Sequence, residues 1–131
     1  MGTVRVLLDT HALLWWLFDD KRLSALARKL IAAADNDLIV SSASAWEITT
    51  KYRIGKLPSA GDVPTRLPVY LRKARMSVLT ISLEHAMVAG ALPGPHRDPF
   101  DRMLIAQSQL EHMPVITVDS IFRDYGVRTC W

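Results

Sequence analysis

The sequence predicts a three-layer α/β fold built on a central, mainly parallel sheet of four to five strands. Short, continuously apolar segments alternate with longer segments whose apolar residues recur at helical spacing. Short apolar strands of this kind are typical of parallel sheets covered by helices on both faces. The chain has 131 residues, 50% of them hydrophobic, which is enough for one core. We therefore expect a single domain over residues 1–131.

The elements follow one another in a regular order. The expected strands cover residues 4–8, 38–41, 78–81 and 115–118, with a weaker candidate at 127–130. The expected helices cover residues 10–18, 23–34, 44–54, 64–75, 83–92 and 99–112. Asp98 and Pro99 predict where the last of these begins, because Asp is a favoured N-cap residue and proline suits the first helical position.

The distribution of apolar residues bears on where the protein is located and how it associates. The chain has no apolar stretch near the roughly 18 to 20 residues of a membrane span, and its start lacks the features of a secretory signal. We expect a cytoplasmic protein with no membrane partner. Residues 10–34 are rich in Trp, Leu and Ile, more than one sheet face readily covers, and this surplus predicts a homodimer surface there.

Four acidic residues are predicted to converge on one site. Asp9 follows the first strand and Asp119 follows the fourth, and ligands of parallel sheets gather at the carboxyl ends of strands near a switch in strand order. Glu47 lies in the third helix, and Asp101 lies in the first turn of the last long helix, where the helix dipole favours a carboxylate. Clustered carboxylates require a cation, and hard oxygen ligands favour Mg²⁺ or Mn²⁺. Such sites commonly cleave or transfer phosphates.

Each acidic residue also has a structural interpretation. Asp9 and Asp119 suit N-cap positions, and Glu47 suits the last position of a capping box that begins at Ser44. The N-cap role assigned to Asp98 makes it a weaker candidate for direct contact with a cation than Asp101.

Other polar and aromatic residues have two interpretations as well. Thr10 and Thr117 lie close in sequence to Asp9 and Asp119, and they either orient these carboxylates or a water, or satisfy local strand and cap preferences. His11 and His96 also lie close in sequence to the proposed ligands. They either hydrogen-bond a carboxylate or phosphate or, as we expect, are ordinary, partly exposed residues. We expect the Trp residues at positions 15, 16 and 46 to belong to the core or to an interface.

Missing motifs exclude several kinds of phosphate chemistry. The sequence has no GxxxxGK[ST] or GxGxxG motif, so it lacks the usual glycine-rich loops that bind nucleotide phosphates. It also lacks HExxH, the zinc-binding motif of metalloproteases. An aspartyl phosphatase would carry a second Asp at position 11, where this chain has histidine. Metal-dependent hydrolysis without a covalent intermediate remains.

Basic residues are concentrated in one segment. Residues 51–75 contain seven Lys or Arg residues and one Asp, although the whole chain has a net charge of only +3. Such a segment is expected to bind a nucleic-acid backbone, and a solvated helical face is the alternative. The candidate contacts are Lys51, Arg53, Lys56, Arg72, Lys73 and Arg75.

Taken in order, several motifs resemble one family. LLDTHALLWW, SSASAWEI followed by TKYRIGKL, HRDPFDRMLIAQ and ITVDSIFRDYGV resemble the PIN-domain ribonucleases, specifically VapC-type toxins of toxin–antitoxin pairs. The resemblance covers nearly the whole chain. It implies a PIN-like fold in which an acidic quartet of Asp9, Glu47, Asp101 and Asp119 is both catalytic and metal-binding.

The resemblance carries further expectations about function. It implies a Mg²⁺- or Mn²⁺-dependent endoribonuclease that hydrolyses RNA through metal-activated water, a homodimer, and inhibition by a VapB-like antitoxin. Two alternatives stay open: a catalytically silent PIN-like binding or regulatory module, and a metal-dependent phosphatase acting on small phosphoesters. A missing acidic residue would favour the first, and a deep closed pocket would favour the second.

Overall fold

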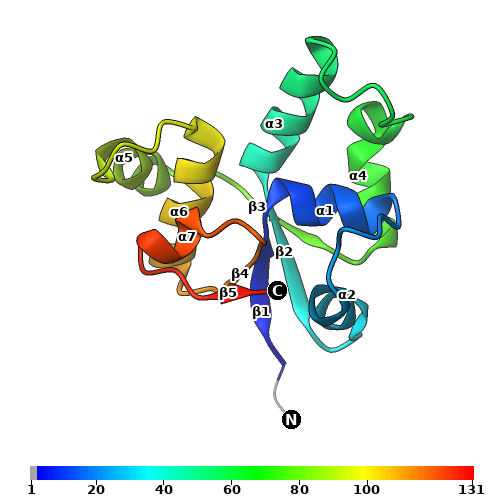
Figure 1. Cartoon of the computed structure of the whole chain (residues 1–131), viewed down its shortest axis with the longest axis horizontal. Coiled ribbons are helices and arrows are strands. Elements are labelled where there is room, and N and C mark those ends of the chain that lie inside the picture. The colour runs from blue at the N-terminus through cyan, green and yellow to red at the C-terminus, as the bar shows by residue number, and fades with distance from the viewer. Residues whose placement is uncertain (1–2) are drawn as a thin grey trace.

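The structure, a computed structural model that describes residues 3–131, contains a five-stranded parallel sheet. Its strands are β1 (Arg5–Leu8), β2 (Asp37–Ser41), β3 (Ser77–Leu79), β4 (Val115–Ile116) and β5 (Thr129–Cys130). The spatial order is β3-β2-β1-β4-β5, and every neighbouring pair is parallel. The chain therefore builds outward from β1 to β3 and then crosses to the other side of β1, which places the switch in strand order between β1 and β4 (Figure 1).

Seven helices connect these strands within residues 3–131. They are α1 (Thr10–Leu17), α2 (Ala25–Ala32), α3 (Ser42–Arg53), α4 (Val63–Lys73), α5 (Leu83–Ala91), α6 (Pro99–Glu111) and α7 (Ile121–Asp124). The six predicted helices are confirmed, and α7 is an additional single turn. Helix α4 is kinked at Arg66, two residues before Pro68, because proline cannot donate a helical hydrogen bond. Across residues 3–131, every helix is too short or too polar to cross a bilayer.

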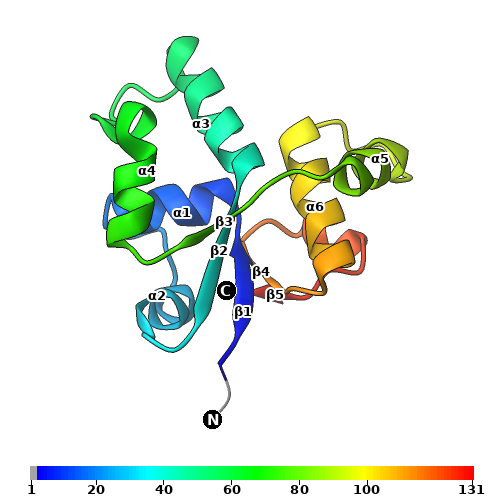
Figure 2. The same cartoon turned by 180° about the vertical axis from the view of Figure 1, so that it is seen from behind.

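Alternate residues of β1 divide the core into two halves. Val6 and Leu8 face one side, where they pack with residues of α1, α2 and α4. Leu7 faces the other side and packs with residues of α6 and α7. Figures 1 and 2 show the sheet nearly edge-on between these two groups of helices. The predicted three-layer α/β/α fold is confirmed.

The predicted apolar surplus in residues 10–34 is present only in part, since Phe18 is 39% and Leu26 49% exposed. Leu13, Leu14, Leu23 and Ile31 are buried in the core, because α1 and α2 both pack on the β1 and β2 side chains of one sheet face. The most exposed large apolar side chains lie on α5 instead, where Leu83 is 79% and Met87 67% exposed.

Candidate active site

The predicted acidic residues lie around the carboxyl edge of the sheet. Helix α1 begins directly after Asp9, which follows β1, and α3 begins directly after β2. Leu8, the last residue of β1, is paired with Val40 of β2 and Ile116 of β4, so these three strands end side by side. Helix α6 also begins at this edge, because its far end leads into the start of β4. The starts of three helices thus surround the ends of three strands.

Asp9 and Asp119 are joined through the hydroxyl group of Thr117. Asp9 is only 5% exposed, and its Oδ1 accepts a hydrogen bond of 2.7 Å from the backbone N–H of Ala12. The Thr117 hydroxyl donates to Asp9 Oδ2 and accepts from the Asp119 N–H at 3.0 Å. Asp9 therefore caps α1, as its structural interpretation predicted, and also belongs to a buried polar cluster. Thr117 orients the Asp9 carboxylate, as one of its two interpretations predicted.

Asp119 lies at the solvent side of this cluster. Strand β4 ends at Ile116, so Asp119 follows it by three residues and is exposed. Its Oδ1 accepts a hydrogen bond of 3.0 Å from the Ile121 N–H, at the start of α7. One carboxylate of the pair is thus buried and the other is open to water.

The buried position of Asp9 changes its acidity. Burial raises the pKa of Asp9 above its usual value, and the negative charge of Asp119 raises it further. The hydrogen bonds from Thr117 and Ala12, together with nearby His11, lower the pKa and oppose this shift. An ionised Asp9 is therefore incompletely compensated by its surroundings, and a cation at this position would stabilise it.

Asp98 and Asp101 have different roles, as the sequence predicted. Asp98 Oδ1 accepts hydrogen bonds from the backbone N–H groups of Phe100 and Asp101 at 2.9 and 3.0 Å, so Asp98 is the N-cap of α6. The Asp101 carboxylate is not used in capping. Its Oδ2 lies 3.0 Å from His96 Nε2. His96 is partly exposed, as expected, and it also hydrogen-bonds a carboxylate, as its other interpretation predicted, because the loop before α6 folds back over the first helical turn.

Asp101 is the second acidic residue with perturbed acidity. Burial raises the pKa of Asp101 to about 6, and the negative charges of Asp98 and Glu47 contribute to this increase. The hydrogen bond with His96 lowers the pKa and opposes the shift. Trp46, which precedes Glu47 on α3, contacts Phe100, which precedes Asp101 on α6, so the two helices bring Glu47 and Asp101 near each other.

Glu47 is buried on the second turn of α3. It is 4% exposed, and its Oε2 accepts an ion pair from the ammonium group of Lys51, four residues further along the helix. This places Lys51, one of the predicted backbone-binding residues, against an acidic residue instead of in solvent.

The predicted capping box between Ser44 and Glu47 is wrong. Helix α3 begins earlier, at Ser42, and its N-cap is Ser41, whose hydroxyl accepts from the Ala43 N–H at 3.0 Å. Ser44 already lies inside the helix, where its Oγ accepts a 2.9 Å hydrogen bond from the hydroxyl of Thr10. Thr10 therefore connects the start of α1 to α3, and Glu47 is free of any capping role.

The quartet thus consists of two pairs, Asp9 with Asp119 and Glu47 with Asp101. Over the described residues 3–131, no three His, Cys, Asp or Glu side chains are arranged as a preformed metal site. The donors nevertheless suit a hard divalent cation, because all four side chains offer carboxylate oxygens. The raised pKa values of Asp9 and Asp101 also show that charge remains to be compensated in each pair.

The basic segment does not form one patch. Lys51 and Arg53 lie on α3, which starts at the carboxyl edge, and Lys56 follows in the next loop. Lys73 ends α4 and Arg75 follows it, just before β3 begins, so both lie at the amino edge of the sheet. Lys73 and Arg75 line a cavity there together with residues 31–34, which lead into β2. Arg72 instead lines a pocket with Ser41 and Ser42, where β2 ends and α3 begins. Residues 51–75 are basic along the chain but divided in space.

Trp46, Arg102 and His11 also lie near the acidic site. Trp46 was expected in the core or an interface; it lies outside the core, is 55% exposed and contacts Phe100 edge-to-face, with ring centroids 4.8 Å apart. Arg102 was not recognised from the sequence. Arg102 donates hydrogen bonds of 2.7 to 3.2 Å to four carbonyl groups of residues 89–96 and so fixes the loop that carries His96. His11 is exposed, as predicted.

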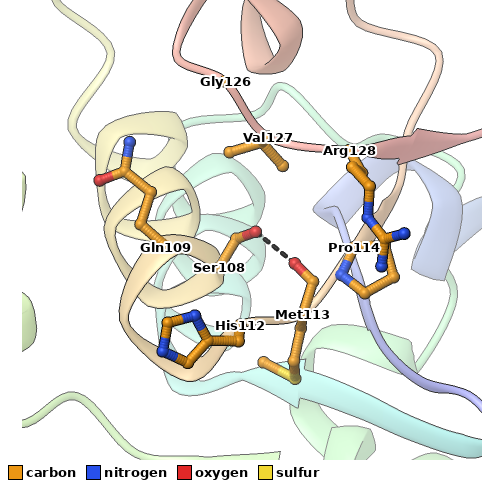
Figure 3. A pocket seen from close by; sticks show the side chains of 8 residues that line it. All are labelled: Ser108, Gln109, His112, Met113, Pro114, Gly126, Val127 and Arg128. Atoms are coloured by element: carbon orange, nitrogen blue, oxygen red, sulfur yellow. Dashed lines mark hydrogen bonds between the residues drawn. The ribbon is translucent and has the colours of Figure 1, made fainter.

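A separate pocket of about 380 Å³ lies at the opposite end of α6 (Figure 3). Its lining residues are Ser108, Gln109, His112, Met113, Pro114, Gly126, Val127 and Arg128. Here the buried Ser108 hydroxyl donates to the carbonyl oxygen of Met113, as Figure 3 shows, so this buried polar group is satisfied within the protein. The pocket is at the amino edge of the sheet, away from the acidic residues.

Comparison with known proteins agrees with this architecture. Residues 6–127 match the PIN domain. The chain belongs to the PIN domain family. The chain is 28% identical over 125 residues to Ribonuclease VapC22 of Mycobacterium tuberculosis (strain ATCC 25618 / H37Rv), an alignment that covers 92% of this chain and 91% of that protein.

Two more similarities bear on the family and the fold. Ribonuclease VapC16 of the same organism is 34% identical over 58 residues, and this match covers 44% of the chain and 41% of VapC16. The crystal structure of VapBC2 from Rickettsia felis bound to a DNA fragment from their promoter superimposes with a TM-score of 0.70, at 15% identity, over 96% of this chain and 97% of that one. The PIN-domain resemblance predicted from sequence is confirmed, and VapC proteins are among its relatives.

Proposed function

We propose that this PIN domain is a Mg²⁺- or Mn²⁺-dependent endoribonuclease and the toxin of a VapBC-type toxin–antitoxin pair. The observation that carries the proposal is the placement of two carboxylates at the carboxyl edge, the buried Asp9 and the partly buried Asp101, whose pKa values are both raised by burial. Buried acids that retain uncompensated charge are typical of functional sites. The names of the VapC relatives support ribonuclease as the activity.

The four carboxylates would hold the divalent cation. Asp9 and Glu47 supply buried ligands, Asp101 supplies a partly buried one at the start of α6, and Asp119 supplies an exposed one after β4. A bound divalent cation supplies Lewis-acid chemistry, which neutralises charge on the scissile phosphate and makes water a better nucleophile. The Asp98 cap, His96 and Thr117 keep the ligands in place, because each one bonds to a ligand or to the backbone beside it.

The RNA is proposed to approach over α3. Arg53 and Lys56 are exposed and continue from the helix that carries Glu47, so they can bind backbone phosphates on either side of the scissile bond. Lys73 and Arg75 are exposed at the other edge of the sheet and would contact only a longer RNA, whereas Arg72 lies beside the start of α3.

The proposed partners are an antitoxin and a second copy of the chain. The solved structural neighbours include toxin–antitoxin complexes, which supports a VapB-like inhibitor. The exposed Leu83 and Met87 on α5 support self-association, since large apolar side chains side by side on a helix favour burial. Light scattering of the purified chain should show a dimer, and a monomer at micromolar concentration would contradict this part of the proposal.

A cleavage assay tests the activity. The purified chain should cleave single-stranded RNA with Mg²⁺ or Mn²⁺, stop cleaving with EDTA, and lose activity by at least about 100-fold on Asp101→Asn. Asp124→Asn is the matched control, because Asp124 is an exposed acid on α7 outside the quartet, and it should cleave like the wild type. Equal activity of Asp101→Asn and wild type would contradict the proposed site.

A further inference from the structure

The one lysine or arginine that forms an ion pair with the quartet, within residues 3–131, is Lys51. Its ammonium group contacts Glu47 Oε2, and the Glu47 side chain is only 5% exposed, whereas that of Lys51 is 31% exposed. Burying a lone carboxylate is costly, and losing the partner of a buried ion pair is costly too. Lys51 therefore supplies a counter-charge to the buried Glu47 carboxylate.

We propose that Lys51 is a resident counter-ion that competes with the divalent cation for Glu47 and, once displaced, binds a phosphate of the RNA. The inference rests on the proposed function and assigns to Lys51 a role in regulating occupancy of the same site. It replaces the expectation that Lys51 simply contacts the nucleic-acid backbone from an open surface.

Charge balance is the reason for competition. Trp46, which precedes Glu47, contacts Phe100, which precedes Asp101, with ring centroids 4.8 Å apart, so a divalent cation that compensates Asp101 would also lie near Glu47. That cation would bring two positive charges beside the ammonium group of Lys51, and like charges at short range in a poorly hydrated site repel strongly. The same carboxylate cannot favourably hold both cations.

The geometry of α3 gives Lys51 somewhere to go. Its side chain starts one helical turn beyond Glu47, is already partly exposed, and has a flexible four-carbon stem. Arg53, two residues later, is exposed at the same end of the helix. A released Lys51 therefore moves from the buried carboxylate toward the surface proposed to hold phosphates, and its charge passes from Glu47 to the substrate.

This role predicts effects of opposite sign in one variant. Lys51→Met should bind Mn²⁺ about 3- to 10-fold more tightly than the wild type, because no ammonium group has to leave Glu47. The same variant should show a higher KM for a single-stranded RNA 20-mer, because a phosphate contact is lost. A residue that only supports the fold would weaken both.

Isothermal titration of the purified full chain with Mn²⁺ is the deciding experiment, with the Mn²⁺-induced increase in Tm as a second readout. Lys51→Arg keeps the charge and should bind Mn²⁺ no more tightly than the wild type. Lys21→Met removes an exposed charge from the loop between α1 and α2 and should leave Mn²⁺ affinity unchanged, which controls for net charge. Circular dichroism verifies that each variant is folded.

Weaker or unchanged Mn²⁺ binding by folded Lys51→Met would overturn the inference, because Lys51 would then orient Glu47 instead of competing with the metal. Tighter binding by Lys21→Met as well would also overturn it, since net charge alone would explain the effect. Failure of the proposed function gives a different pattern: wild-type Mn²⁺ affinity would be the same as that of Asp101→Asn, whatever residue 51 is.

Discussion

The two edges of the sheet treat their buried polar groups differently. At the amino edge, the pocket in Figure 3 contains a buried hydroxyl, Ser108, whose hydrogen bond to Met113 is complete within the protein. At the carboxyl edge, Asp9 and Asp101 also have hydrogen-bond partners, yet burial raises the pKa of both. At the amino edge, the buried Ser108 hydroxyl has its hydrogen-bond partner. At the carboxyl edge, the hydrogen bonds to Asp9 and Asp101 do not fully compensate the cost of removing their charges from water.

This contrast identifies the functional edge by chemistry instead of by shape. A satisfied hydroxyl stabilises the fold and has no need of a ligand. A buried carboxylate with a raised pKa favours any ligand that brings positive charge. The acidic edge is therefore the candidate active site, although the well-formed pocket of Figure 3 lies elsewhere.

The largest expected difference between the edges is in catalysis. Asp9→Asn should reduce RNA cleavage by at least about 100-fold, because it removes a charged ligand while the Asn oxygen can still cap α1. Ser108→Ala should change cleavage less than twofold but lower the free energy of unfolding by about 1 kcal/mol, since it leaves the Met113 carbonyl without its partner. Cleavage rates and urea unfolding of both variants check this. A comparable loss of cleavage in Asp9→Asn and Ser108→Ala would contradict the proposed difference between the carboxyl and amino edges.

RNA binding should also differ between the edges. Replacing Arg53 and Lys56 with Ala should flatten the dependence of log affinity on log salt by roughly 0.7 for each lost phosphate contact. Replacing Lys73 and Arg75 with Ala should have a smaller effect with a short RNA, because both residues line the cavity at the amino edge. Fluorescence anisotropy over a salt series measures both slopes. A larger change from the Lys73 and Arg75 pair would contradict the proposal that RNA binds over α3.

The two acids at the start of α6 provide a comparison within one helical turn. Asp98→Ala should lower the free energy of unfolding by about 1 kcal/mol, because two backbone N–H groups lose their acceptor. The measurement is urea denaturation with EDTA present. An unchanged free energy of unfolding would show that Asp98 does not stabilise α6 as its hydrogen bonds indicate.

Asp101→Asn should have the opposite and smaller effect on stability. The pKa of Asp101 is about 6 in the folded protein against 3.8 as the reference for the unfolded chain, so the folded state binds more protons between these values. Wild-type stability therefore gains from this group as pH falls from about 6 to about 4, and loses that gain above pH 6. At pH 8 the variant should be more stable by about 0.5 kcal/mol, after allowance for solvent screening.

Urea unfolding in EDTA at pH 8 and pH 4 tests this sign. The stability advantage of Asp101→Asn should shrink toward zero at pH 4, where the wild-type carboxyl is protonated in the folded state. Asp124→Asn should show no such pH-dependent advantage, because its carboxyl is exposed. A variant that is less stable than the wild type at pH 8 would contradict the burial argument.

Local sequence patterns predicted the fold well because most of it depends on near neighbours. Alternating apolar strands and helices gave the three layers, and the Asp98–Pro99 pair correctly located the start of α6. The ion pair between Glu47 and Lys51 also has a local signal, since residues four apart share a helix face. That spacing was available in the sequence, although Lys51 was assigned to the nucleic-acid backbone.

The misassigned features depend on contacts between distant segments. His96 reaches Asp101 because Arg102 holds the intervening loop, and no periodic pattern encodes that arrangement. Ser44 is paired with Thr10, 34 residues away, and so cannot begin a capping box. The basic segment is divided because α3 and α4 carry its two ends to opposite edges, which charge counting along the chain cannot detect.

The central claim is that the two carboxylate pairs act on one cation. Isothermal titration of Mn²⁺ into the wild type, Asp9→Asn and Asp101→Asn tests it most directly, because these residues belong to different pairs. We expect saturable binding by the wild type that weakens by at least about tenfold in each variant, since each removes a charged ligand of the shared cation. If either folded variant bound Mn²⁺ as tightly as the wild type, the two pairs would not share a cation and the proposed active site would be wrong.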